Sequence, residues 1–109
     1  MERRILFILF LLFSFCLGCI SEGSKVSSGD AVSACVLECQ NLKSTANYSN
    51  GPCLSNEIMP DWVCDVAHNP RQGVDNQPEN QCSSFREGKA HHFVEVDENC
   101  LLIRSIEDE

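Results

Sequence analysis

Eight cysteines and three histidines are the side chains of this 109-residue chain best suited to disulfide, redox or metal chemistry. Six of the cysteines follow position 30 and are spread along the rest of the chain. In a small exported protein, an even set of this kind predicts up to three disulfides, although six cysteines allow 15 pairings. The six are Cys35, Cys39, Cys53, Cys64, Cys82 and Cys100.

The spacing of Cys35 and Cys39 favours a structural role over a redox one. A thioredoxin-type site has two residues between its cysteines, at a helix N-terminus that lowers the pKa of one thiol. Here three residues intervene, and Glu38 would oppose a thiolate. Because Cys35 and Cys39 lie one helical turn apart, we expect them to pair with two different distant segments.

The three histidines define the candidate metal or acid–base groups. Cys64 and His68 have a ligand-like spacing, but no second short motif accompanies them. On a strand, His91 and His92 point to opposite faces, so they do not chelate one ion together. His91 with Glu95 offers a weak metal or acid–base pair, against a solvated sheet face as the alternative. We expect no metal, no cofactor and no catalytic residue.

The first 19 residues read as an export leader. A basic start at 1–4 precedes an apolar run, Ile5 to Ile20, of 16 residues; a spanning helix needs roughly 17–25. Gly18-Cys19 resembles a lipoprotein box, which makes Cys19 a candidate lipidation site. The alternatives are that Cys19 is an ordinary residue near a cleavage site, or that 1–19 is a retained membrane anchor.

The compartment and the charge restrict the partners. Residues 20–29 have the composition of a flexible tether, so the chain is expected to be exported and then anchored to the cell membrane by lipid or signal anchor, or secreted. The net charge of -8 argues against a nucleic-acid partner, because phosphate binding needs a basic face.

The elements predicted around these residues form a small α+β domain over residues 30–106, followed by an acidic tail at 107–109. Apolar residues at helical spacing predict a helix over 31–44 with Asp30 as its N-cap. Alternating or apolar runs predict strands at 62–67, 90–97 and 100–106, the last two joined as a hairpin through 97–99. Val94 and Val96 are expected to share a face with Leu101 and Ile103. The fold expected is one N-terminal helix and a three-stranded antiparallel sheet, with long loops and disulfides that staple the domain.

Two expected loops carry candidate recognition features. Asn47 begins an N-glycosylation sequon, Asn47-Tyr48-Ser49, in a stretch over 47–59 without periodicity. The loop 68–81, bracketed by Cys64 and Cys82, is rich in amides and almost free of apolar side chains. Amides pair donors with acceptors, which suits a glycan or peptide ligand. This loop is therefore either an ordered binding surface beside His91 or His92, or a passive connector.

The stretches 51–56, 61–82 and 90–97, with the leader 18–21, are similar to small cysteine-rich exported or lipoprotein-like archaeal proteins of unassigned function. The resemblance implies a compartment and an architecture, and no activity.

The sequence thus favours a membrane-tethered, disulfide-rich extracytoplasmic module that binds a protein or glycan without catalysis. One alternative is a small metal- or redox-handling protein that uses His91, Glu95 and His68. Another is an inhibitor-like domain that presents the loop from Leu54 to Trp62.

Overall fold

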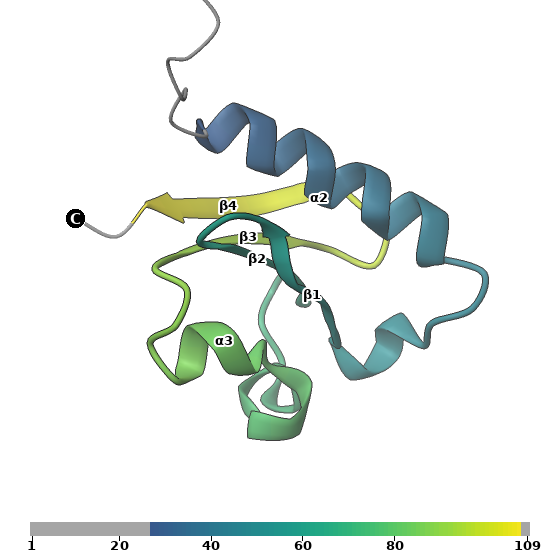
Figure 1. Cartoon of the computed structure of the whole chain (residues 1–109). Helices are drawn as coiled ribbons and strands as arrows, with labels where there is room; N and C mark the ends of the chain where they lie inside the picture. The colour runs from purple at the N-terminus through teal and green to yellow at the C-terminus, as the bar shows by residue number, and fades with distance from the viewer. Residues whose placement is uncertain (1–26, 108–109) are drawn as a thin grey trace, which may run out of the picture.

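A four-stranded sheet with one long helix on a single face forms the domain, in a computed structural model that describes residues 27–107. Helix α2 (Ser28–Leu42) lies above the sheet, and the short helix α3 (Ser83–Arg86) lies below it (Figure 1). The strands are β1 (Cys53–Met59), β2 (Trp62–Val66), β3 (His92–Val96) and β4 (Leu102–Glu107). The predicted α+β class and stapled domain are confirmed.

The sheet is mixed, with the order β1-β2-β3-β4. The pairs β1–β2 and β3–β4 are antiparallel, as hairpins are, whereas β2 and β3 run parallel. The expected three-stranded antiparallel sheet is therefore wrong in strand number and in one orientation. Parallel neighbours need a long crossover, and residues 67–91 supply it, so the stretch expected to be an irregular loop is the connection that makes the sheet mixed.

Helix α2 begins three residues earlier than the sequence predicted. Ser27, not Asp30, is the N-cap, because the Ser27 hydroxyl accepts the Asp30 N–H at 3.3 Å and donates to the Asp30 carboxylate at 2.9 Å. Asp30 instead places its charge in the first turn, where the helix dipole favours an anion. Residues 28 and 29, expected in the tether, belong to the helix.

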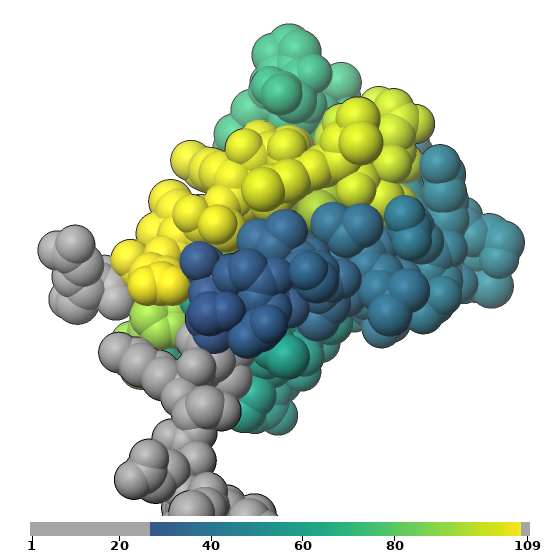
Figure 2. All heavy atoms as spheres, turned by 90° about the horizontal axis from the view of Figure 1, so that it is seen from above, coloured from purple at the N-terminus to yellow at the C-terminus, as the bar shows by residue number. Residues whose placement is uncertain are grey.

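The main core lies between α2 and the sheet. Every second residue of β2 and β3 faces the helix, and these are fully or almost fully buried: Trp62, Cys64, Val66, Val94 and Val96. Ala31, Cys35 and Cys39 meet them from the helix. Figure 2 shows α2, in dark blue, lying along β4, in yellow. Leu101 precedes β4 and is exposed, so its expected place beside Val94 is wrong; only Ile103 is partly buried.

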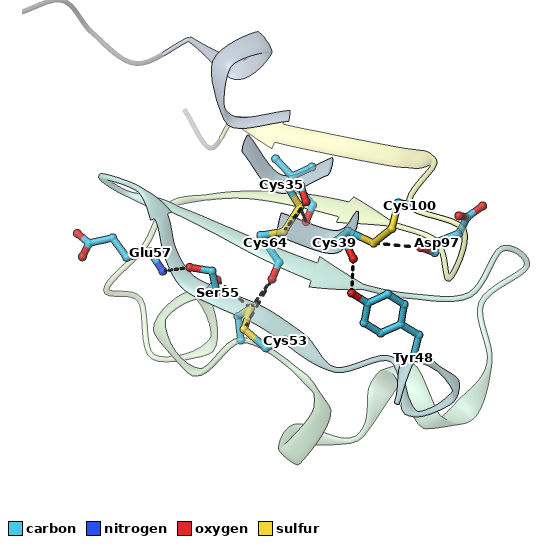
Figure 3. Close-up of a disulfide and its surroundings, with 11 residues drawn as sticks. Cys35, Cys39, Tyr48, Cys53, Ser55, Glu57, Cys64, Asp97 and Cys100 are labelled. Carbon is cyan, nitrogen blue, oxygen red and sulfur yellow. Dashed lines mark hydrogen bonds between the residues drawn. A yellow bond between two sulfur atoms is a disulfide. The ribbon is translucent and has the colours of Figure 1, made fainter. Parts of the chain in front are cut away.

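Three disulfides fix the layers to one another (Figure 3). Two start from α2: one reaches β2, and the other reaches the turn before β4, so Cys35 and Cys39 do serve separate segments. The third ties β1 to the crossover. The pairs are Cys35–Cys64, Cys39–Cys100 and Cys53–Cys82. Three disulfides in a small domain are typical of an oxidising environment.

No helix within residues 27–107 is long and apolar enough to span a bilayer. The leader 1–19, Cys19 and most of the tether 20–29 lie outside the described residues. Glu107, expected in the acidic tail, is the last residue of β4.

Candidate functional site

The sheet face opposite α2 carries a pocket of about 400 Å³, which we call the open-face pocket. Its floor comes from the residues of β2, β3 and β4 that alternate with the core residues, and its walls come from the crossover and α3. The residues that matter chemically are Asp65, Arg71, Phe85, Arg86, Phe93, Glu95 and Arg104. The register places them together, because Asp65 lies opposite Glu95 and Glu95 opposite Arg104.

Glu95 is the centre of the charge arrangement. It is only 4% exposed, and each of its carboxylate oxygens binds a different arginine. The Arg104 Nε donates to Oε1 at 2.6 Å, and the Arg71 Nη1 donates to Oε2 at 2.9 Å. A carboxylate this buried is tolerated only when it is paired and hydrogen-bonded, and the two arginines provide this pairing while Glu95 holds both of them in position.

Asp75 holds Arg71 in place by ordering the crossover. The Asp75 carboxylate accepts the backbone N–H groups of His68 and Gln72 at 3.0 and 2.9 Å, and the His68 ring at 3.0 Å. Burial raises the pKa of Asp75, but these hydrogen bonds outweigh it and the pKa is lowered. Arg71 then donates from Nη2 to the Asp75 carbonyl at 3.2 Å. Two short 3₁₀ helices, η2 (Gly73–Asn76) and η3 (Pro78–Asn80), result.

Gly51 makes this packing possible. Its backbone is in the left-handed region at φ 62°, and a Cβ at this position would collide with the Asp75 carboxylate. The turn before β1 and the crossover therefore approach through a residue without a side chain. The loop 68–81 is thus an ordered, hydrogen-bonded segment, but it adjoins Glu95 in the pocket rather than His91 or His92.

Asp65 is the unusual titratable group of the pocket. Its Oδ1 is buried and has no hydrogen-bond partner among residues 27–107. Burial, and then the negative charge of Glu95, raise its pKa to about 8, against a smaller opposing effect of Arg71. At neutral pH the carboxyl is therefore mostly protonated and neutral. Asp65 points away from the helix side of the sheet, into the open-face pocket.

Aromatic rings form the apolar part of the pocket. Phe85 from α3 and Phe93 from β3 meet edge to face, with centroids 4.9 Å apart. The Arg104 guanidinium carbon lies 5.3 Å from the Phe93 centroid, which is cation–π geometry. The two Nη groups of Arg104 contact no acceptor among residues 27–107, although its side chain is only 51% exposed.

His91 and His92 both contact Asp61 rather than Glu95. The His91 Nδ1 is 2.7 Å from Asp61 Oδ1, and the His92 Nε2 is 3.2 Å from Asp61 Oδ2. The hydrogen bond from His91 is the largest effect on the pKa of Asp61, which is lowered. The His91–Glu95 pair, one of the two alternatives for this histidine, does not form, because Glu95 faces Arg71 and Arg104.

The other predicted site residues are placed as follows. Cys64 and Cys82 are in disulfides and His68 binds Asp75, so they do not assemble as a ligand set. No group of three or more metal-ligating side chains is found within residues 27–107. The segment 54–62, expected as a presented loop, is mostly strand β1, and its Leu54, Ile58 and Met59 pack on the core.

Asn47 is exposed and is the N-cap of a 3₁₀ helix, η1 (Tyr48–Asn50). Its side-chain oxygen accepts the Ser49 N–H at 3.2 Å and the Ser49 hydroxyl at 2.5 Å. Glycosylation at Asn47 stays a prediction.

Sequence reasoning missed the open-face pocket. The signal that was present is the alternation of β3, which places Phe93 and Glu95 on one face and Val94 and Val96 on the other. Arg71 gave no signal, because nothing in the loop sequence shows which strand residue it reaches.

No protein-family model matches this chain, and no similar curated protein or solved structure is found.

Proposed function

We propose that this protein is a non-catalytic, extracytoplasmic binding module, tethered to the membrane by its N-terminus, and that it takes its ligand in the open-face pocket. The observation that carries the proposal is the pocket itself: charged and aromatic side chains converge on about 400 Å³ of accessible space. A concave site of this size, lined by apolar groups with a few placed polar ones, is the usual form of a small-ligand site.

The support for a binding role comes from how firmly the polar groups are positioned. Glu95 and Arg71 are held by the contacts with Arg104 and Asp75, so the pocket needs little rearrangement to accept a ligand. A preorganised site loses less conformational entropy on binding. The Cys53–Cys82 disulfide further fixes the start of α3, and with it Phe85, over the sheet.

The proposed extracytoplasmic location is supported by the three disulfides together with the expected leader at 1–19. The proposed arrangement is an exported domain held at the membrane by lipid on Cys19 or by an uncleaved leader. The intact mass of the native protein from the membrane fraction tests this arrangement. A lipid-modified chain that begins at Cys19, or an uncleaved chain in the membrane fraction, is expected; an unmodified full-length chain in the cytosol contradicts it.

The binding role is tested by nuclear magnetic resonance on the purified, oxidised full-length chain in detergent micelles. A library of neutral, cationic and anionic fragments is titrated, and amide shifts are followed. We expect saturable shifts that gather at Phe93, Glu95 and Arg104, and that disappear in Phe93→Ala. Shifts that never saturate, or that gather on α2 instead, contradict the proposal.

A further inference from the structure

The open-face pocket carries a net positive charge in an acidic protein. Arg71, Arg86 and Arg104 contribute three positive charges and Glu95 one negative charge, which leaves +2 while Asp65 is neutral. The whole chain has a net charge of -8. A local reversal of sign in a partly enclosed site concentrates anions there.

Arg104 presents an unused hydrogen-bonding edge to this space. Its Nε binds Glu95, and its guanidinium lies over Phe93, so the plane of the group is set. The two Nη groups at its far end have no acceptor among the described residues. Two parallel N–H donors in one plane match the two oxygens of a carboxylate or a phosphate.

The rest of the pocket suits an apolar body attached to that anion. Phe85 is exposed enough to accept a further contact, and its edge-to-face partner Phe93 lies beneath Arg104. A ring or short alkyl group placed there covers aromatic surface that water otherwise contacts. Favourable ring contacts follow the same edge-to-face or offset geometry.

Asp65 adds a hydrogen-bond donor at the floor. The charged groups around it are Glu95 on β3, Arg71 and Asp75 on the crossover, Arg86 on α3 and Arg104 on β4. Its Oδ1 is buried and has no hydrogen-bond partner among residues 27–107. Asp65 lines the pocket, so its protonated carboxyl can turn a donor toward a ligand oxygen, and buried polar groups are normally paired.

We propose that the ligand of the open-face pocket is an apolar organic oxyanion, with its anionic group on the free end of Arg104 and its apolar body against Phe85 and Phe93. This inference rests on the proposed function, since it names the ligand class for the same pocket. A carboxylate and a phosphate share the required chemistry, and the experiment separates them.

The test titrates benzoate, phenyl phosphate and the neutral isostere benzamide into the full-length chain at pH 6, followed by amide shifts. At least one of the two anions is expected to bind at Phe93 and Arg104 about tenfold or more tighter than benzamide, the scale of a charge-assisted hydrogen bond. The anion that binds tighter identifies the headgroup.

Variants at Arg104 test the contact itself. Arg104→Lys keeps the charge near Glu95 but loses the planar fork, so the affinity for the anion is expected to fall about tenfold. Arg104→Gln is expected to weaken it further. Lys43→Gln, which removes an exposed positive charge on the C-terminal side of α2, is the matched control and is expected to leave the affinity unchanged.

The pH dependence tests Asp65. As pH rises from 6 to 9, Asp65 loses its proton near pH 8, and the new negative charge repels the anion. The affinity for benzoate, which is fully ionised throughout this range, is therefore expected to fall for the native chain and to stay constant in Asp65→Asn, which keeps a donor and never ionises.

Three results overturn the inference. They are equal binding of benzamide and both anions, an Arg104→Lys variant that binds as tightly as the native chain, and loss of affinity in Lys43→Gln equal to that in Arg104→Lys. If neutral or cationic fragments bind at Phe93 while the anions do not, the ligand class is wrong and the binding function stands. If no fragment binds there, both fail.

Discussion

The two faces of the sheet use the same strands for opposite purposes. On the helix side, β2 and β3 present apolar side chains that are completely covered by α2 and joined to it by the Cys35–Cys64 disulfide. On the open side, the alternate residues of the same strands present the Glu95–Arg71 ion pair and a carboxyl, Asp65, one oxygen of which has no partner within residues 27–107. The crossover above them has little apolar content. Strand β3 shows the contrast within neighbours, from Phe93 to Val94 to Glu95.

This contrast shows where stability and function are separated. Apolar burial and disulfides stabilise the helix side, whereas burial of ionisable groups on the open side costs free energy that a purely structural layer would avoid. A protein of this size has little stability to spare. The open side therefore contains the groups whose burial lowers the stability of the fold, and such groups are commonly found at binding sites.

The largest effect is expected from the disulfide that joins the end of α2 to the turn before β4. Cys39→Ala with Cys100→Ala opens a link between residues 61 apart, which lowers the free energy of unfolding by about 4 kcal/mol through the entropy of the unfolded chain. Urea unfolding under non-reducing conditions measures the change.

The matched variant removes Cys53–Cys82, which spans 29 residues on the open side. It should cost less, about 3.5 kcal/mol on the same scale. If this variant is the less stable of the two, the length of the loop that each disulfide closes does not determine its contribution to stability.

The next effect concerns the charge of Asp65. Its pKa in the folded state is raised to about 8, so the folded protein holds a proton that the unfolded chain releases near pH 4. The free energy of unfolding is therefore highest at about pH 4 and falls as pH rises towards 8. Above pH 8 the loss is complete.

Asp65→Asn should remove this decline and be more stable than the native chain at pH 7. Urea midpoints from pH 4.5 to 8.5 measure the difference. The lowered pKa values of Asp61 and Asp75 act in the opposite direction, and only as pH falls below about 4. If the urea midpoints of the native chain and of Asp65→Asn change with pH in the same way, burial of Asp65 does not lower the stability of the fold.

Two neighbouring substitutions on β3 sharpen the comparison directly. Val94→Ala leaves a cavity in the core and should lower the free energy of unfolding by about 2 kcal/mol while fragment binding at the pocket persists. Phe93→Ala should abolish that binding with a smaller loss of stability, because Phe93 is only partly buried. If Val94→Ala abolished binding, or if Phe93→Ala lowered stability more than Val94→Ala, stability and binding would not be divided between the two faces of the sheet.

Local patterns made one side of the molecule predictable. The periodicity of α2, the alternation in β2 and β3, and the turn at 97–99 depend on neighbouring residues, so the helix and three of the four strands were expected. Strand β1 was not predicted, because its residues are only partly buried or exposed and its pairing with β2 is interrupted by two irregularities. Its hairpin turns through Asp61 at φ 72°, a position where sequence patterns usually show glycine.

The open side was not predictable for a related reason. Its contacts join residues far apart in sequence, such as Arg71 with Glu95, and a single polar loop residue gives no sign of its partner. The parallel pairing of β2 and β3 was hidden as well, because a crossover whose helices are only three or four residues long resembles a structureless loop in sequence. The amide-rich segment was identified as unusual, and its position beside Glu95 came only from the fold.

The smallest effect is expected at Tyr48, which closes the helix side at the end of α2. Its hydroxyl donates to the Cys39 carbonyl (Figure 3), so Tyr48→Phe should lower the free energy of unfolding by about 1 kcal/mol, the loss of one buried hydrogen bond. Burial, and then the charge of Glu38, raise the pKa of Tyr48 above its ordinary value. The contribution of this group is therefore complete below pH 10 and is lost as pH rises through the raised pKa. Since the chain has a single tyrosine, phenolate absorbance in the ultraviolet follows this group alone. Two results would show that Tyr48 does not act through this hydrogen bond. One is a phenol titration with the midpoint of an ordinary tyrosine, and the other is a Tyr48→Phe variant as unstable as Val94→Ala.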